Sequence, residues 1–151
     1  MIIRPAGTGD AEDLARLRWE FRSGLGQPEE TAEEFQARCR RWMRERLDGL
    51  AGWRCWVAEE SGEAVGSVWL QLIEKLPNPV VEPERHAYIS SLYVRPTLRG
   101  QRTGSALLAA ALEACRVLEV DAVILWPTEE SRRLYARHGF AVRDDVMERR
   151  G

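Results

Sequence analysis

Residues 93–108 read Tyr-Val-Arg-Pro-Thr-Leu-Arg-Gly-Gln-Arg-Thr-Gly-Ser-Ala-Leu-Leu: the end of an apolar strand, a turn with two glycines, and the start of a helix. The first N–H groups of a helix have no partner within it, and together with the helix dipole they attract anions. Glycine lets a ligand approach the backbone, and Arg99 and Arg102 can add charged contacts. The stretch predicts a phosphate site; the alternative is a glycine-containing turn that binds nothing.

The same turn excludes two common nucleotide sites. It contains no Gly-Lys-Ser/Thr, so it is not a Walker P-loop, and it lacks the G-x-G-x-x-G pattern of dinucleotide sites.

The elements around the turn follow from apolar periodicity and turn residues. After it we expect a helix over 106–119, a strand over 121–126, a helix over 129–138 ended by Gly139, and a terminal hairpin of 140–142 and 145–148. Before it we expect a strand over 86–94, preceded by a proline-rich loop over 76–83 and a hairpin of 53–60 and 63–74 that turns at Ser61-Gly62. The strand over 63–74 is apolar on both faces, so it should be central and covered on both sides.

The first fifty residues predict a short strand and two helices. The strand is residues 1–5, and the first helix begins at a Thr8 or Asp10 cap, carries Leu14, Leu17 and Phe21 inward, and ends at Gly24 and Gly26. The second helix covers residues 30–50, with a buried stripe of Phe35, Cys39, Trp42, Met43, Leu47 and Leu50.

The resulting order is β-α-α-β-β-β-α-β-α-β-β. Consecutive strands in the middle predict antiparallel pairs, and the strand-helix-strand step around the turn predicts a parallel pair. The fold class is therefore α/β: a mixed, mostly antiparallel sheet with helices on both faces. At 151 residues we expect a single domain over 1–151.

Composition and charge limit the partners. Lys plus Arg (22) nearly balance Asp plus Glu (24), which gives no electrostatic case for nucleic acid. No stretch approaches the ~18 apolar residues of a membrane span, and the first residues lack a signal-peptide run, so we expect a cytoplasmic protein with no membrane partner. Cys39, Cys55 and Cys115 form no C-x-x-C pair and read as reduced buried thiols; we expect no metal site.

Two motifs resemble the GNAT acetyltransferases. Residues 99–104 are similar to the family's Arg/Gln-x-x-Gly-x-Gly/Ala turn, and residues 137–140, preceded by Leu134-Tyr135, resemble its second motif. The element order matches that fold from end to end. One departure is Arg102, where the family has glycine; a left-handed backbone there would cost on the order of 1 kcal/mol and bears on affinity rather than on the fold.

The resemblance implies where acetyl-CoA would bind. In the family the strand before the turn splays from its neighbour and pairs with the pantetheine arm, and the turn holds the pyrophosphate. Carried over, the coenzyme-binding residues are Leu92, Tyr93, Val94, Arg99, Gly100, Gln101, Arg102, Thr103, Gly104 and Ser105, with Thr128 where many members carry an asparagine. Ser90-Ser91 would lie near the reacting centre, or they simply fill the strand.

The chemistry needs an acid for the leaving thiolate, and the resemblance implies Tyr135. A tyrosine, with a reference pKa of about 10, suits that task; the alternative is a core tyrosine whose hydroxyl meets the backbone. The oxyanion donor would be a backbone N–H near Val94. The base stays open among Glu74, Glu82, Glu84 and His86, which we place near the mouth of the site, and bulk solvent.

The function expected from this resemblance is N-acetyl transfer from acetyl-CoA to a primary amine; the alternative is a non-catalytic acyl-CoA sensor or partner-binding module. The acceptor is open between a small-molecule amine and a protein amine, and the oligomeric state between a monomer and a homodimer. Of six tryptophans, core packing accounts for Trp19, Trp42 and Trp53, while Trp56, Trp69 or Trp126 could line the acceptor pocket or lie in the core.

Overall fold

The computed structural model describes residues 1–49 and 52–151. Its elements, in chain order, are β1 (Ile2–Pro5), α1 (Ala11–Arg22), α2 (Ala32–Arg46), β2 (Trp53–Glu60), β3 (Glu63–Glu74), β4 (Arg85–Val94), α3 (Thr103–Val117), β5 (Val123–Ile124) and α4 (Arg132–Arg137), with single 3-10 turns at Thr8–Asp10, Ser23–Leu25 and Pro96–Leu98.

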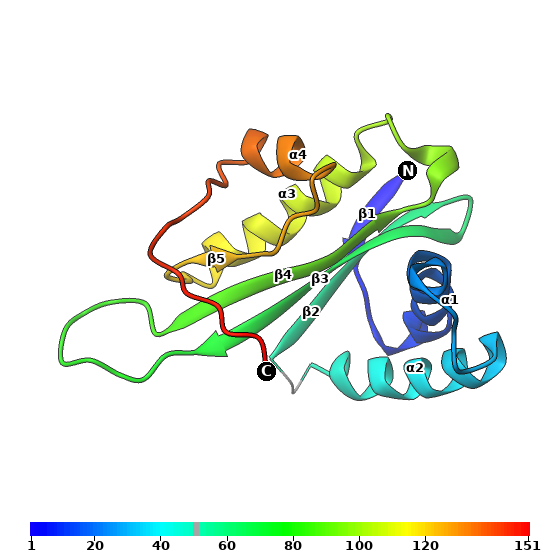
Figure 1. Ribbon diagram of the computed structural model, residues 1–151, viewed down its shortest axis with the longest axis horizontal. Helices are drawn as coiled ribbons and strands as arrows, with labels where there is room; N and C mark the ends of the chain where they lie inside the picture. The colour runs from blue at the N-terminus through cyan, green and yellow to red at the C-terminus, as the bar shows by residue number, and fades with distance from the viewer. Residues whose placement is uncertain (50–51) are drawn as a thin grey trace.

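The five strands form one sheet in the order β1-β2-β3-β4-β5. The first three pairings are antiparallel and the β4–β5 pairing is parallel, as the strand-helix-strand step predicts. Helix α3 covers one face of the sheet, and α1 lies on the opposite face (Figure 1). The mixed, mostly antiparallel sheet with helices on both faces is confirmed.

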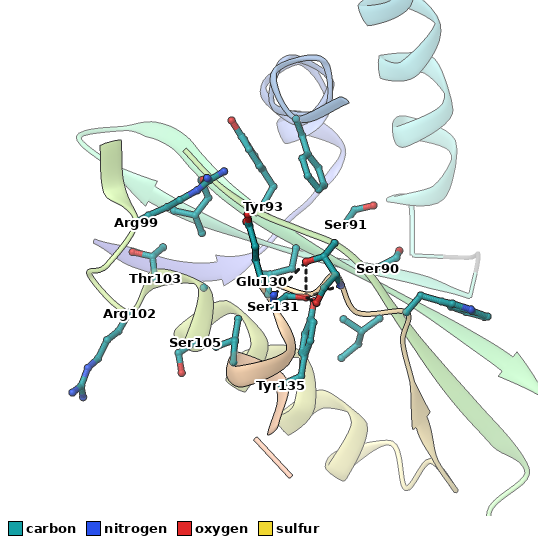
Figure 2. A pocket seen from close by; sticks show the side chains of 18 of the residues that line it. Ser90, Ser91, Tyr93, Arg99, Arg102, Thr103, Ser105, Glu130, Ser131 and Tyr135 are labelled. Carbon is teal, nitrogen blue, oxygen red and sulfur yellow. Dashed lines mark hydrogen bonds between the residues drawn. The ribbon is translucent and has the colours of Figure 1, made fainter. Parts of the chain in front are cut away.

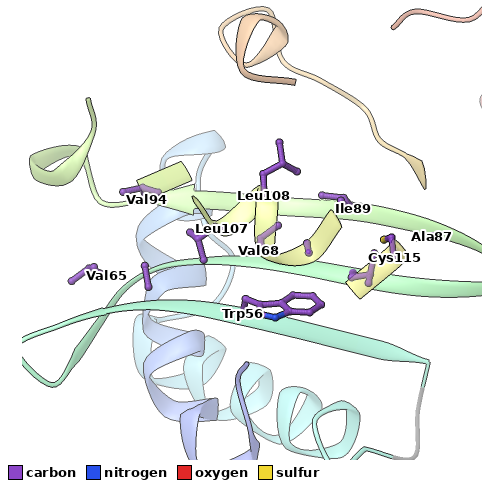
Figure 3. Close-up of a cluster of buried hydrophobic side chains, with 12 residues drawn as sticks. Trp56, Val65, Val68, Ala87, Ile89, Val94, Leu107, Leu108 and Cys115 are labelled. Atoms are coloured by element: carbon purple, nitrogen blue, oxygen red, sulfur yellow. The ribbon is translucent and has the colours of Figure 1, made fainter. Parts of the chain in front are cut away.

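Each face of the sheet has its own hydrophobic core. Under α3, side chains from β2, β3 and β4 meet Leu107 and Leu108 (Figure 3). On the other face, Leu14 and Leu17 of α1 meet Val57, Trp69 and their neighbours. Residues 64–70 of β3 are all buried, because this strand is covered on both sides. The prediction of a central β3 is confirmed.

Helix α2 is shorter and less buried than its sequence pattern predicts. It starts at the Thr31 cap, whose hydroxyl accepts the Glu34 N–H at 3.2 Å, and it ends at Arg46. Of the expected stripe only Met43 is fully buried, while Trp42 is 36% exposed; Leu50 lies outside the described residues. The reason is that α2 packs mainly on α1 (Figure 1), and meets the sheet through few side chains, among them Trp42, whose ring lies 5.2 Å from Trp53 and 5.9 Å from Trp69 between centroids.

The predicted terminal hairpin is wrong. Between residues 140 and 151 the described chain contains no strand, and residues 141–151 are exposed, Val142, Val146 and Met147 included. A hairpin is stable only when it buries an apolar face, and these side chains find none. The predicted order therefore loses its last two strands and becomes β-α-α-β-β-β-α-β-α.

Three more element bounds differ around the turn. Helix α3 begins three residues earlier than predicted, β5 keeps only two residues, and α4 spans only Arg132–Arg137. Gly139 does follow α4 with a left-handed backbone (φ 88°), as a C-terminal glycine should.

The three cysteines are free. Cys55 and Cys115 are buried and Cys39 is half-buried, and burial raises the pKa of each thiol. Within residues 1–49 and 52–151, no group of three or more His, Cys, Asp or Glu side chains is placed to hold a metal ion. The helices described there are too short or too polar to cross a membrane.

Candidate functional site

A groove of about 1530 Å³ opens between the end of β4, the start of α3, the segment around α4, and α1. All of the predicted site residues except Gln101 line it: Leu92, Tyr93, Val94, Arg99, Gly100, Arg102, Thr103, Gly104, Ser105, Thr128 and Tyr135. Figure 2 shows six of them, Tyr93, Arg99, Arg102, Thr103, Ser105 and Tyr135, coming from these separate elements. Residues far apart in sequence thus meet at one place.

Strand β4 is only half paired on the side of the groove. Strand β5 pairs with it at Ala87 and Tyr88, and the remainder of β4, residues 89–94, pairs with β3 alone. The Arg95 N–H donates to the Val65 carbonyl of β3 at 3.0 Å. Because successive N–H groups of a strand point to opposite edges, the Val94 N–H faces the groove.

A bulge interrupts β4 where the groove begins. Its register with β3 shifts between the Trp69–Ser90 and Ser67–Tyr93 pairs, so Ser91 and Leu92 lie opposite a single residue. Ser91 takes a left-handed backbone (φ 57°), which is uncommon for a residue with a side chain. The bulge places Ser90 and Ser91 on the groove wall.

The start of α3 leaves unpaired donors on the groove. The first helical bond runs from the Ala106 N–H to the Arg102 carbonyl at 3.0 Å. Within the described parts of the chain, no acceptor pairs with the N–H groups of Thr103, Gly104 and Ser105. A Cβ added to Gly104 would meet only ordinary contacts, at 3.8 Å and 3.9 Å. The fold itself therefore does not require a glycine here.

Arg102 takes the left-handed conformation that its family position implies. Its φ is 62° and ψ 16°, and it caps α3. Its side chain is exposed and points away from the other labelled groove residues (Figure 2). Arg99 instead turns inward, and its Nε donates to the Val94 carbonyl at 3.1 Å. Of the two arginines, Arg99 is thus the one held against the groove.

Tyr135 comes from α4 and lines the groove. Its ring meets the edge of Phe140 at 5.7 Å between centroids, and the side chain is half-buried. Burial, with a smaller contribution from Tyr88, raises the pKa of the Tyr135 phenol. No hydrogen-bond partner for the hydroxyl occurs among residues 1–49 and 52–151. Within those residues, no backbone group accepts from or donates to the Tyr135 hydroxyl.

Polar contacts order the turn before α4 and link the end of α4 to α3. The hydroxyl of Thr128 donates to Ser131 Oγ at 2.9 Å, and Ser131 Oγ in turn accepts the Thr128 N–H at 2.8 Å. Ser105 Oγ lies 2.7 Å from His138 Nε2. Thr128 and Ser105 thus hold the loop and helix that carry Tyr135, in addition to lining the groove.

The structure does not bring the four candidate bases to the groove. Glu74, Glu82, Glu84 and His86 lie at the other end of the β3–β4 hairpin, and none of them lines it. The carboxylates that do line it are Glu129 and Glu130, next to Thr128 in sequence. Their position next to Thr128 is the sequence feature that could have indicated them as groove residues.

Helix α1 contributes residues that the sequence did not indicate. Arg18, Phe21 and Arg22 line the groove, and Arg18 Nη1 donates to Ser91 Oγ at 3.0 Å. Among the tryptophans, Trp56 and Trp69 are buried in the core. Trp126 is 65% exposed, lines the groove and meets the edge of Tyr88 at 5.1 Å.

Comparison with known proteins adds independent evidence. The model of the acetyltransferase (GNAT) family matches residues 11–140. An uncharacterised N-acetyltransferase of Archaeoglobus fulgidus is 30% identical over 145 residues, or 90% of each chain. A crystal structure of a GCN5-related N-acetyltransferase from Ralstonia eutropha superposes with a TM-score of 0.77 at 29% identity, covering 98% of this chain and 97% of that one.

A more distant structure shows the same fold. It is that of a predicted acetyltransferase with acetyl-CoA from Clostridium acetobutylicum, at a TM-score of 0.77 and 20% identity over 99% of this chain and 95% of that one. With the family match extending over most of the chain, from α1 to the residue after Gly139, this protein belongs to the GNAT family of acetyltransferases.

Proposed function

We propose that this protein moves an acetyl group from acetyl-CoA to a primary amine by direct attack. The observation that carries the proposal is the convergence, on one groove, of the unpaired amides that begin α3, the unpaired edge of β4 and the Tyr135 side chain. The Clostridium acetobutylicum structure, described with acetyl-CoA, supports the same cosubstrate for this chain.

The chain's residues fit such a ligand. The N–H groups of Thr103, Gly104 and Ser105 would hold the diphosphate, and the missing side chain of Gly104 leaves room for it. The free edge of β4 would pair with the amides of the pantetheine arm as an added strand does. Arg99, fixed at the Val94 carbonyl, adds positive charge nearby.

The residues around the thioester supply the remaining chemistry. Acetyl-CoA supplies a thioester whose carbonyl carbon is attacked by a neutral amine. The Val94 N–H, which faces the groove, stabilises the negative charge on the carbonyl oxygen. Tyr135 gives its phenolic proton to the sulfur as the carbon–nitrogen bond forms and the carbon–sulfur bond breaks, and the amine loses its proton to water. The raised pKa keeps the Tyr135 proton in place until then.

Acetyl transfer is tested with acetyl-CoA and a panel of amines, including amino acids, aminoglycosides and lysine peptides, while free thiol is followed. We expect thiol release that depends on the amine and yields an acetylated product by mass spectrometry. Coenzyme A binding by calorimetry without turnover of any amine would favour the alternative of an acyl-CoA sensor or partner-binding module. Absence of coenzyme A binding would exclude both the acetyltransferase and the acyl-CoA sensor.

A further inference from the structure

A second, smaller cavity adjoins the groove at α1. It has a volume of about 330 Å³, and it shares Arg18 and Arg22 with the groove. Its apolar wall comes from α1, the 3-10 turn and loop after it, and α2: Trp19, Leu25, Pro28 and Phe35. Trp19 and Phe35 lie 5.9 Å apart between ring centroids and form one side of this wall.

The two shared arginines carry charge that the protein does not neutralise. In residues 1–49 and 52–151, no carboxylate forms an ion pair with Arg18 or Arg22. Arg18 donates to the neutral Ser91 hydroxyl, and both guanidinium groups lie over Phe21, at 5.9 Å and 5.1 Å from its ring. Burial, and then the charge of Arg22, holds the pKa of Arg18 below its usual value. Two like charges held together this way favour an anion between them.

The other charged groups around the cavity leave this excess in place. Glu30 and Arg38 pair with each other at 2.6 Å and cancel. Glu29 is the remaining carboxylate of the lining, and it is exposed. The mouth that the cavity shares with the groove is therefore positive, while its wall is apolar.

We propose that this cavity binds the acetyl acceptor, and that the acceptor is a free α-amino acid with an apolar or aromatic side chain. The carboxylate would lie against Arg18 and Arg22, whose planar guanidinium groups match it, and the side chain against Trp19 and Phe35. A volume of about 330 Å³ is at the small end for ligand pockets, which suits one amino acid rather than a protein segment. This inference rests on the proposed acetyl transfer.

The position of Arg18 relative to the bulge supports the assignment. Arg18 contacts Ser91, which lies within the unpaired edge of β4 from Ile89 to Val94. In an α-amino acid the amine is on the carbon next to the carboxylate. A carboxylate held by Arg18 therefore brings its amine to the same end of β4 that would carry the thioester.

The test compares ligands that differ only in the carboxylate. L-phenylalanine and 2-phenylethylamine are titrated by calorimetry into the protein saturated with coenzyme A, and kcat/KM is measured for both with acetyl-CoA. We expect the amino acid to bind at least tenfold more tightly than the amine, this ratio to fall severalfold in Arg18→Met, where Arg22 remains, and to fall to about one in the double variant Arg18→Met with Arg22→Met. Arg18→Lys should restore part of the ratio, and Arg44→Met, at an exposed position of α2 outside both cavities, should leave it unchanged.

Equal binding of the two ligands, or no binding of L-phenylalanine, would overturn the proposal. So would an Arg18→Met variant that weakens both ligands by the same factor, since this would mean that Arg18 only supports the bulge through Ser91. Failure of the proposed acetyl transfer itself would look different. In that case coenzyme A would bind, but no amine of any class would cause release of free thiol.

Discussion

The two halves of strand β4 differ in how their edges are hydrogen-bonded. From Arg85 to Tyr88 the strand is bonded on both edges, to β3 and to the segment from Asp121 to Ile124. From Ile89 to Val94 it is bonded to β3 alone, and its other edge faces a groove of about 1530 Å³. An unpaired strand edge can pair with other chains, and proteins usually cover it. Because this edge is open and lies beside the unpaired amides of α3, it indicates a place for a ligand.

The largest expected effect comes from the core that supports both halves. Leu70 is fully buried and pairs in register with Ile89, where the halves meet. Leu70→Ala should lower the free energy of unfolding by about 3 kcal/mol, since it leaves a cavity in a packed core. Urea denaturation followed by tryptophan fluorescence measures this, and a loss below about 1 kcal/mol would mean that the core does not hold the strand.

The next largest effect is at Tyr135 of α4, which lines the groove along the unpaired half of β4. Tyr135→Phe should lower kcat at least tenfold, or about 1.4 kcal/mol, and leave coenzyme affinity within about twofold. The ring contact with Phe140 remains in this variant, and the lost hydroxyl has no partner among the described residues. Stability should therefore be unchanged.

The pH dependence gives a second readout for Tyr135. Its pKa is raised, so the phenol keeps its proton and wild-type kcat should fall only above about pH 10. That alkaline decline should be absent in Tyr135→Phe. An identical profile in both proteins would remove Tyr135 from the acid role.

Two glycines near Val94 separate ligand binding from folding. A Cβ on Gly104 would meet ordinary contacts, so Gly104→Ala should unfold with the same free energy as the wild type or up to about 1 kcal/mol more. Its coenzyme A affinity, measured by calorimetry, should fall about tenfold, or about 1.4 kcal/mol, because the methyl group would occupy the place proposed for the diphosphate. Unchanged affinity would contradict the phosphate site.

The matched control is Gly66 of β3. A Cβ there would lie 2.9 Å from the Tyr93 carbonyl and 3.3 Å from Leu107 and Val94 side-chain atoms. Gly66→Ala should therefore destabilise the protein by about 1–3 kcal/mol. Gly104→Ala is thus expected to lose coenzyme affinity and keep its stability, whereas Gly66→Ala is expected to lose stability.

The smallest expected effect is at Arg102. Its left-handed backbone costs a side-chain-bearing residue on the order of 1 kcal/mol, so Arg102→Gly should raise the free energy of unfolding by about 0.5–1 kcal/mol. Thermal denaturation monitored by circular dichroism detects a change of this size. A destabilised variant would show that the arginine side chain makes contacts that outweigh the strain.

The sequence predicts the sheet well, because its strands are bounded by turn residues and carry unbroken apolar patterns. The bounds of β2 and β3 agree with the prediction, and the glycine-containing turn of residues 99–104 leads into the start of α3. The contributions of Arg18 and Arg22 depend on how α1 packs against the bulge of β4, and no local pattern encodes that contact. The prediction of a hairpin over residues 140–148 is wrong for a related reason. The apolar residues there match a strand pattern, but the fold offers no apolar surface on which they could be buried.

The candidate bases show the same limit. Glu82 and Glu84 are close in sequence to β4, but they precede its paired half, whereas the groove lies at its open half. Sequence distance to a strand does not tell which end of it carries the site.

A crystal structure of the complex with coenzyme A tests the central claim most directly. Diphosphate oxygens within hydrogen-bond distance of the Gly104 and Ser105 N–H groups, with the pantetheine arm along residues 92–94, are the result expected. A nucleotide bound elsewhere, with the first turn of α3 closed by side chains, would contradict the assignment of the groove.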